Sequence, residues 1–461
     1  MTEVQTASVE ASGKQAQPAG RLRAHLIRGA AGSFVLQVGF AGLAFLNAII
    51  LARILGAEGY GAFVNAMAWV SLLTIPATFG FGILLVRDTA IYRSQEKWGQ
   101  LKGLLRFSNR IVFVLSVVLA LIAAAVAGWL FSSPTQATMR HTVWIALVLL
   151  PLFSLYNLRE AATRGLECVI RACLPGMIVR PGLLFVGIVS IYYFWPKHLS
   201  APTAMVVNVG AGLVALALGM FFLRTLLPQE VKTATPEYTL RPWLKAALPM
   251  LIYGGAQVIL GQTDIVMLGA MRGAHEVGLY AAANRLAFLI TYALLASNMI
   301  LAPVISRLYN NGEKDRLQNI ITKNVRVAFL LVVPFSLMLV FKGDYILSYF
   351  GREFMLAQSA LVILTISYLI AVSLGAGAPI LSMTGYPQKV AVVLSLMVFL
   401  NISLNVILIP SFGINGASVA TAASSVGSGL LLALLSKKNS GITPTIFGNV
   451  IARIKISTKD E

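Results

Sequence analysis

The feature that most constrains the fold is a series of long apolar stretches separated by short polar segments. Backbone polar groups in lipid must be hydrogen-bonded within the protein, so only α-helices or closed β-barrels can span a bilayer. Barrel strands are shorter and alternate in hydrophobicity, whereas a spanning helix needs about 20 apolar residues. The stretches that approach this length are 34–53, 62–85, 111–131, 142–162, 173–195, 203–223, 246–271, 277–303, 325–341, 356–383, 388–409 and 417–436. The sequence therefore predicts an all-α polytopic membrane protein with about twelve transmembrane helices.

The distribution of positive charge supports twelve spans and indicates their orientation. Of the 36 Lys and Arg residues, 28 fall in the alternate segments that include both termini, six fall in the other loops, and two lie within spans. Cytoplasmic loops carry an excess of Lys and Arg, so both termini are expected in the cytoplasm. The same bias accounts for the net charge of +19, which in a soluble protein would suggest a nucleic-acid partner. No nucleic-acid partner is expected here.

An internal repeat divides the chain into two copies of six spans. Four small residues in the second copy match the same residue types 217 positions earlier. The matches are Gly273 with Gly56, Ala274 with Ala57, Gly278 with Gly61, and Ala283 with Ala66. Because each copy has an even number of spans, both insert the same way up and are related by a pseudo-two-fold axis along the membrane normal. A binding site is expected near the membrane midplane between the two six-helix bundles.

Loops and repeat together predict five segments. They are a cytoplasmic disordered tail (1–30), an N-terminal six-helix bundle (31–224), a cytoplasmic linker (225–245), a C-terminal six-helix bundle (246–436) and a cytoplasmic tail (437–461). In the last tail, apolar residues recur at three- to five-residue steps from Ile442 to Ile454, and Thr443-Pro444 is typical of a helix start. The pattern predicts a short amphipathic helix on the inner membrane surface, with a frayed tail as the alternative.

Sequence motifs of enzymes and cofactor sites are missing from the chain. It contains no Gly-x4-Gly-Lys-Ser/Thr phosphate loop, no His-Glu-x-x-His zinc motif and no Gly-x-Ser-x-Gly elbow. Cys168 and Cys173 have no metal-ligand pattern around them. We therefore expect neither an enzyme nor a cofactor or metal site.

Three charged residues lie within the apolar spans, where charge is costly and usually functional. Asp264 and Arg285 are at similar depths in two successive, antiparallel spans, so their side chains can meet. One interpretation is a structural ion pair. The other is that Arg285 faces a lumen and that Asp264 modulates Arg285. Arg180 lies just before Pro181. Its long side chain either extends to the membrane–water interface or provides a second lumenal cation.

Neutral amides add hydrogen-bonding groups within the spans. Some are expected to join helices, and others to line a polar pathway. The candidates for substrate contact are Asn47, Gln262, Asn284, Asn401 and Asn405.

Three stretches of the sequence resemble a known family. They are Asn-x5-Arg-Ile-Leu-Gly-x2-Gly-Tyr-Gly-x-Phe from Asn47 to Phe63, the stretch from Asp264 to Arg285, and Asn-x4-Pro-x2-Gly-Ile-x-Gly-Ala from Asn405 to Ala417. Together with the duplicated layout, over about residues 30–436, they are similar to the lipid-linked oligosaccharide flippases. That family is part of the multidrug/oligosaccharidyl-lipid/polysaccharide exporter superfamily.

The resemblance implies a function and partners. It implies two bundles that form a V around a cationic cavity, for which Arg180 and Arg285 are the candidates. The transported molecule would be an undecaprenyl-diphosphate-linked oligosaccharide, moved across the bacterial inner membrane for O-antigen (lipopolysaccharide), capsule or exopolysaccharide biosynthesis. H⁺ or Na⁺ would be the coupling ion, with Asp264 as the candidate coupling residue. Membrane lipid and the polysaccharide polymerase and chain-length proteins would be further partners.

Several alternatives remain open from the sequence. An ion-coupled multidrug or cation antiporter of the same superfamily would need an acid-rich lumen, whereas the charges found within the spans sum to one positive charge. A lipid II flippase usually has two further spans. A membrane polymerase or ligase of the same pathway would need a large outer loop, and no loop here exceeds about 25 residues.

Overall fold

The computed structural model describes residues 19–133 and 136–448, and in these ranges every regular element is a helix. The first half of the chain contains α1 (Ala19–Thr78), α2 (Phe81–Ser94), α3 (Trp98–Leu130), α4 (Ala137–Leu147), α5 (Leu149–Gly165), α6 (Val169–Leu174), η3 (Pro175–Val179), α7 (Arg180–Phe194), η4 (Pro196–His198), α8 (Ala201–Leu226) and α9 (Gln229–Thr233). The second half contains α10 (Leu240–Met271), α11 (Ala274–Phe288), α12 (Thr291–Asn310), α13 (Lys314–Leu347), η5 (Arg352–Ala357), α14 (Gln358–Leu374), α15 (Gly377–Met383) and α16 (Pro387–Ser440).

The helices provide the predicted twelve spans. Eight helical segments of the described chain are long and apolar enough to cross a membrane, and the bent pair α11–α12 makes a ninth. Two of them are divided by a non-helical glycine, Gly56 in α1 and Gly413 in α16, so that each supplies two spans. Helix α10, with 32 residues, also exceeds the length needed. The protein is therefore an all-α, multi-pass membrane protein.

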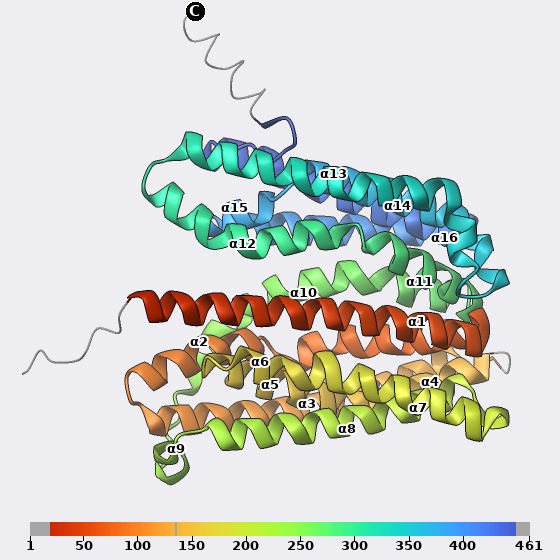
Figure 1. Ribbon diagram of the computed structural model, residues 1–461. Coiled ribbons are helices and arrows are strands. Elements are labelled where there is room, and N and C mark those ends of the chain that lie inside the picture. Colours follow the sequence, from red (N-terminus) through yellow and green to blue (C-terminus); the bar gives the residue numbers. More distant parts are fainter. Residues whose placement is uncertain (1–18, 134–135, 449–461) are drawn as a thin grey trace, which may run out of the picture.

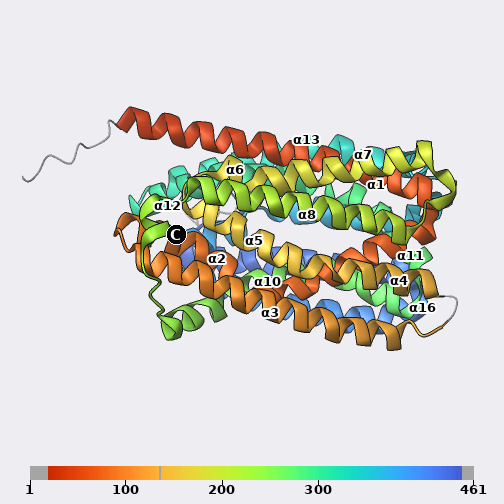
Figure 2. The same cartoon turned by 90° about the horizontal axis from the view of Figure 1, so that it is seen from below.

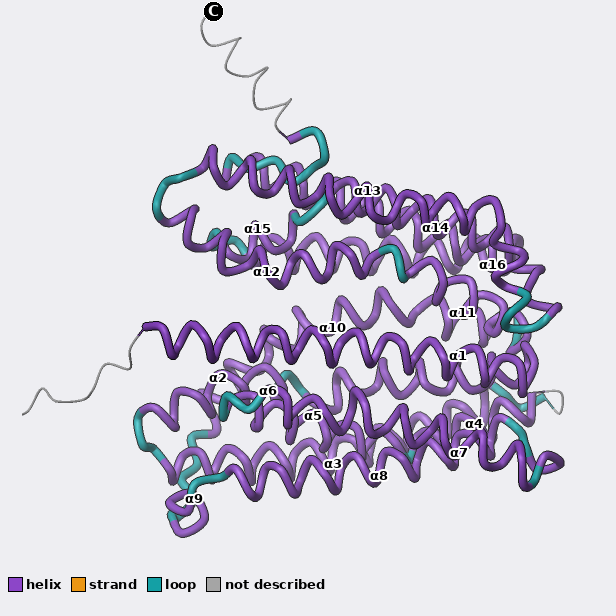
Figure 3. Tube along the Cα trace, in the orientation of Figure 1, coloured by secondary structure: helices purple, strands orange, loops and turns teal. Residues whose placement is uncertain are grey.

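The two halves of the chain form two bundles packed side by side. Figure 1 shows α1–α9 in one layer and α11–α16 in the other, with α1, α10 and α11 where the layers meet. Figure 3 shows most of the loops at the two ends of the molecule, as expected for helices that run from one membrane surface to the other. The helices also lie roughly parallel when the molecule is viewed from below (Figure 2).

The two ends of the molecule differ. The start of α1 and the end of α16 lie at the same end of the molecule, which we call the terminal end (Figures 1 and 2). The first part of α1 runs to the opposite end, where the chain turns at its non-helical Gly56, and we call this the Gly56 end. In Figure 1 the ribbons of α1 and α12 draw apart toward the terminal end.

The predicted repeat is visible in the backbone. Gly56 has φ 69° and ψ 178°, and Gly273, 217 positions later, has φ 92° and ψ 179°. This region of backbone space is essentially restricted to glycine. Both glycines therefore turn the chain between two helices in the same way, which explains why this position is glycine in each copy.

Contacts between α1 and α11 follow the same symmetry. A Cβ on Gly61 would lie 1.8 Å from the Ala274 carbonyl oxygen, and a Cβ on Gly278 would lie 2.0 Å from the Ala57 carbonyl oxygen. Gly278 lies 217 positions after Gly61, and Ala57 lies 217 positions before Ala274, so the repeat converts one contact into the other. The pseudo-two-fold axis therefore passes between these helices. Backbones can approach this closely only where there is no side chain, as in other packed membrane helices.

Further contacts join the two bundles at the Gly56 end. The backbone N–H of Ala57 donates a 2.6 Å hydrogen bond to the Glu353 carboxylate of η5. Tyr60 of α1 packs edge-on against Phe354, with ring centroids 6.2 Å apart. Phe45 makes a similar contact with Phe350 at 6.0 Å. The bundles are therefore closed against each other at this end.

Both tails differ from the sequence predictions. Residues 19–30 are helical, because α1 continues well beyond its apolar part, where a disordered tail to residue 30 was expected. Helix α16 ends at Ser440 rather than 436, and residues 442–447 are not helical. The Gln318 side chain pairs with both the N–H and the carbonyl of Thr443 at 2.8 Å and holds the segment against α13. The part of the predicted amphipathic helix from residue 449 on lies outside the described residues.

Candidate functional site

A cavity of about 440 Å³ lies between the two bundles. Its walls come from α1, η3, α7 and α8 of the first half and from α10, α11, α14 and α16 of the second. Six residues singled out from the sequence line it, namely Asn47, Arg180, Gln262, Asp264, Asn284 and Arg285. The cavity lies between the two copies of the repeat, where a binding site was predicted, and substrate binding there stays a prediction.

Arg180 is placed in the cavity by a break in the helical hydrogen-bond pattern. The residues before it form a turn of π-helix, in which the Arg180 N–H bonds to the Pro175 carbonyl five positions back. The turn leaves backbone groups without helical partners, and the Tyr156 hydroxyl of α5 pairs with two of them. It accepts a 3.0 Å hydrogen bond from the Gly176 N–H and donates one of 3.1 Å to the Ala172 carbonyl. Such π-turns occur often at functional sites.

The Arg180 guanidinium contacts neutral partners only. Its Nε donates a 3.3 Å hydrogen bond to Asn208 of α8, and the guanidinium carbon lies 4.0 Å from the centre of the Phe153 ring. In the described part of the chain, no carboxylate forms a salt bridge with it. Its positive charge is thus not balanced by any carboxylate of the residues that the structure describes.

Asn47 joins α1 to the broken helix beside Arg180. Its amide donates hydrogen bonds of 2.9 Å to the Leu43 carbonyl and to the Pro181 carbonyl. Only 6% of Asn47 is exposed, so its amide oxygen is the group that remains for a ligand. Asn47 thereby ties the wall of the cavity to the turn that positions Arg180.

Arg285 lies on the opposite wall, on α11, and is exposed. Neighbouring Asn284 accepts a 2.8 Å hydrogen bond from the Tyr368 hydroxyl of α14. Among the described residues, Arg285 forms no salt bridge with Asp264 or any other acid. Of the two interpretations of these charges, the structural ion pair is not the arrangement observed, and Arg285 faces the cavity.

Asp264 is bound by neutral donors of its own bundle. Its carboxylate accepts hydrogen bonds from the Asn405 amide at 2.6 Å, from the Tyr280 hydroxyl at 2.8 Å, and from the Thr421 hydroxyl. Asp264 is only 4% exposed. A buried charge needs such hydrogen bonds to be tolerated, and these bonds connect α10 with α11 and α16.

Asn401 and Asn405 support Asp264 from behind and are not among the residues that line the cavity. The Asn405 amide also donates to the Asn401 backbone and side-chain oxygens, at 3.0 and 3.1 Å. Asn401 in turn donates to the Ser424 hydroxyl at 3.1 Å. Both asparagines are essentially inaccessible, at 1% and 0% exposure. The structure therefore places these two candidates in a buried network rather than on the wall.

Sequence inspection missed four polar side chains of the site. Their contacts identify them as Asn208, Tyr280, Tyr368 and Thr421. Each lies within an apolar run, and polarity inside a span is the signal that would have singled them out. The described residues contain no group of three His, Cys, Asp or Glu side chains that could hold a metal ion.

Chemically, the cavity presents two guanidinium groups and several amide and hydroxyl groups. The one carboxylate among the described residues that line it is that of Asp264, whose two oxygens already accept hydrogen bonds. Guanidinium groups match phosphate and carboxylate oxygens, and amides can both donate and accept hydrogen bonds. The arrangement suits an anionic group next to a polar, uncharged one.

Comparison with known proteins identifies the family. The family model described as polysaccharide biosynthesis protein matches residues 26–309, which is more than half of the chain. The chain belongs to the polysaccharide biosynthesis protein family. A second family model, MatE, matches residues 249–407 of the same chain. The resemblance drawn from the sequence is thereby confirmed.

Relatives and solved structures agree with the family. The chain is similar to the probable low-salt glycan biosynthesis flippase Agl15 of Haloferax volcanii, with 27% identity over 409 residues. This alignment covers 85% of the chain and 79% of Agl15. Its fold is similar to an inward-facing MATE family multidrug resistance transporter of the MOP superfamily, with a TM-score of 0.73, 13% identity, and 87% and 94% of the two chains covered. The lipid II flippase MurJ in an inward closed conformation gives a TM-score of 0.70 at 13% identity, over 89% and 87% of the chains.

The stability lost on replacing Asp264 is expected to depend on whether the new side chain still offers a hydrogen-bond acceptor. Asp264→Ala removes the acceptor that the buried donors of Asn405, Tyr280 and Thr421 share, so that only the bonds of Asn405 to Asn401 and of Tyr280 to Thr421 remain. A buried donor that loses its acceptor costs about 1–3 kcal/mol. Asp264→Asn keeps one acceptor oxygen and should cost less. Thermal unfolding of the purified protein measures both effects. Asp315→Ala, at an exposed position at the start of α13, is the control, and equal stability of Asp264→Ala and this control would contradict the role assigned to Asp264.

Proposed function

We propose that this protein is a flippase that moves a lipid-linked glycan from one leaflet of a membrane to the other. The carrier lipid in this proposal is undecaprenyl diphosphate, and the glycan is a repeat unit of a surface polysaccharide such as O-antigen, capsule or exopolysaccharide. The proposal places the protein in a bacterial inner membrane with both termini in the cytoplasm. The named glycan flippase among its relatives supports the substrate class.

The observation that carries the proposal is the uncompensated positive charge of the inter-bundle cavity. Arg180 and Arg285 line it from opposite bundles without salt-bridge partners in the described chain. A diphosphate head group is costly to move through a membrane unless fixed cations and water surround it. Two guanidinium groups on opposite walls would bind the diphosphate from two sides.

The neutral polar groups of the cavity suit the glycan. Asn47, Gln262, Asn284 and Ser71 line the wall together with the tyrosines Tyr60 and Tyr368. Sugar hydroxyls both donate and accept hydrogen bonds, as these amides and hydroxyls do. A cavity of about 440 Å³ is within the range of small-molecule sites. We therefore assign the guanidiniums to the diphosphate and the neutral groups to the first sugars.

A cation antiporter is the second candidate, favoured by the MatE match to residues 249–407. Export of a cation needs a carboxylate that can exchange the drug for H⁺ or Na⁺. Asp264 is the candidate for such coupling in either function. Its three neutral hydrogen-bond donors and the two unpaired arginines make the cavity better suited to an anion.

Disrupting the gene in the organism that carries it tests the proposal. The expected result is loss of surface polysaccharide, with lipid-linked repeat units accumulating in the leaflet where they are made. A plasmid copy of the wild-type gene should restore export. Normal surface glycan in a disrupted strain that has no second transporter of this family would overturn the proposal, and a gain in sensitivity to cationic drugs would favour the antiporter instead.

A further inference from the structure

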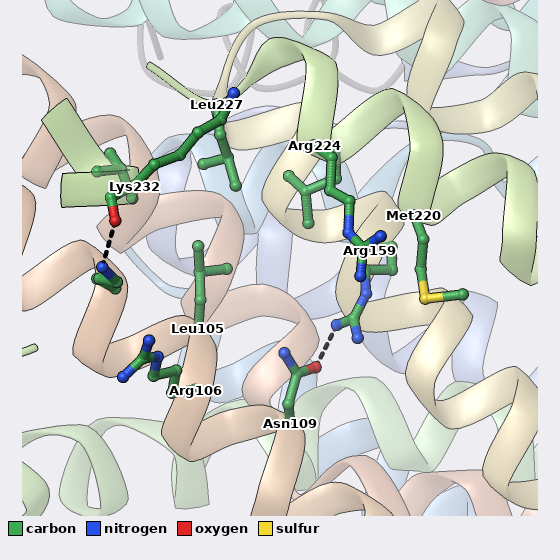
Figure 4. A pocket seen from close by; sticks show the side chains of 11 residues that line it. Leu105, Arg106, Asn109, Arg159, Met220, Arg224, Leu227 and Lys232 are labelled. Carbon is green, nitrogen blue, oxygen red and sulfur yellow. Dashed lines mark hydrogen bonds between the residues drawn. The ribbon is translucent and has the colours of Figure 1, made fainter. Parts of the chain in front are cut away.

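A second cavity, also of about 440 Å³, lies at the terminal end of the first bundle and is lined by five cations. We call it the basic pocket; its cations are Lys102, Arg106, Arg159, Arg224 and Lys232. They come from α3, α5, α8 and α9, and Figure 4 shows four of these five side chains labelled around it. Figure 1 shows α3, α8 and α9 on the side of the first bundle away from the second. The basic pocket is therefore separate from the cavity between the bundles.

Within residues 19–133 and 136–448, no carboxylate balances these charges. Neither Asp nor Glu occurs among the described residues that line the pocket. The Lys102 ammonium donates to backbone carbonyls of Lys232 and Ala234, the latter at 2.8 Å. Arg159 donates to the neutral side chain of Asn109 (Figure 4). Glu160, the acid next to Arg159 in the chain, forms its salt bridge with Arg164 instead.

Two of the guanidinium groups lie close to each other. Arg159 of α5 and Arg224 of α8 interact electrostatically, and their side chains are adjacent in Figure 4. Like charges in a partly buried place repel, and an anion between them would convert that repulsion into attraction. Several guanidinium N–H groups that converge on one space form a typical site for phosphate oxygens.

The depth of the pocket matches that of lipid head groups. Lys102, Arg159 and Arg224 lie four, six and two residues from the ends of α3, α5 and α8, or within about 9 Å of those ends at 1.5 Å per residue. The remaining wall is largely apolar, including Leu105 and Met220. Basic pockets at this level between membrane helices recognise the head groups of anionic lipids.

We propose that the basic pocket binds the phosphate of an anionic phospholipid from the leaflet at the terminal end. The cations of α3, α5 and α8 would hold the phosphate, and the apolar wall would accept the first methylene groups of the lipid. Binding would also involve α9, which begins the connection between the two bundles. The lipid would thereby fix this connection against the first bundle.

Native mass spectrometry of the full-length protein in detergent tests the proposal. The probes are phosphatidylglycerol, zwitterionic phosphatidylcholine and inorganic phosphate. The expected result is preferential binding of phosphatidylglycerol, weakened about tenfold or more in Arg224→Gln with Lys232→Gln, because bonds to charged groups are lost. Arg224→Lys should keep part of the binding. Arg110→Gln is the matched control, since Arg110 is exposed on the same helix as Arg106 but does not line the pocket.

Three outcomes would overturn the proposal. They are unchanged phosphatidylglycerol binding in the folded double variant, an equal loss in Arg110→Gln, and binding of inorganic phosphate with no preference for the lipid. Circular dichroism and gel filtration show whether the double variant is folded. If it is not, Arg224→Lys and Arg106→Gln provide the same comparison with smaller changes.

Discussion

Replacing Arg285 with alanine is expected to reduce glycan export by about ten- to a hundred-fold while the protein remains in the membrane at its normal level. The factor corresponds to losing hydrogen bonds to a charged group, worth about 1.5–3 kcal/mol. Arg285 has no acidic partner in the described chain, so removing it leaves no buried charge unpaired and should not unfold the bundle. Export of labelled repeat units, measured with the amount of protein, distinguishes the two effects.

The pattern of substitutions should identify the interaction. Arg285→Lys keeps the charge but loses the planar donor pair, so it should retain part of the export. Arg180→Ala should resemble Arg285→Ala, and the double variant should export nothing measurable. Arg53→Ala is the control, because Arg53 is exposed on α1 and lies outside the cavity. Full export by the double variant at normal protein level would exclude a lumenal role for both arginines.

The number of spans and the internal repeat could be predicted because both leave a pattern in the sequence. Apolar runs of spanning length give the twelve spans, and glycines spaced by 217 residues give the repeat. Gly56 and Gly273 have the same backbone geometry because the same turn is needed in each copy. The ends of helices were predicted less well. Residues 19–30 are helical outside the apolar run, and the fold of Thr443 onto Gln318 depends on a residue 125 positions away.

The site was predicted as a set of residues but not as a set of contacts. Equal depth suggested that Asp264 and Arg285 meet, yet depth does not say toward which side of a helix a residue points. The partners of Asp264 on α16 lie 141 and 157 positions away, and only the packing of α10 against α16 brings them together. Arg180 was singled out because it is a charge in an apolar run, and its role in binding stays a prediction. The π-turn that places it has no sequence motif.

The last prediction concerns the glycines at which the bundles meet. Gly61→Ala and Gly278→Ala would place a methyl group 1.8 and 2.0 Å from backbone carbonyl oxygens of the other bundle. Because the obstacle in each case is backbone, α1 and α11 must separate. Overpacking of this kind costs about 1–3 kcal/mol, and it falls only on the state in which the Gly56 end is closed. We expect both variants to favour a state open at that end and to lose most of their export.

Spin labels at Arg53 of α1 and Arg352 of η5, which are both exposed near the Gly56 end, report the separation directly. The distance between the labels should increase in either variant, and equally in both, because the two contacts are related by the pseudo-two-fold axis. Gly42→Ala is the matched control, since it lies on α1 with no atom within 4 Å of the added methyl group. There the substitution should only favour the helix, by up to about 1 kcal/mol. An unchanged label distance with full export in Gly278→Ala would mean that transport does not require this end to close.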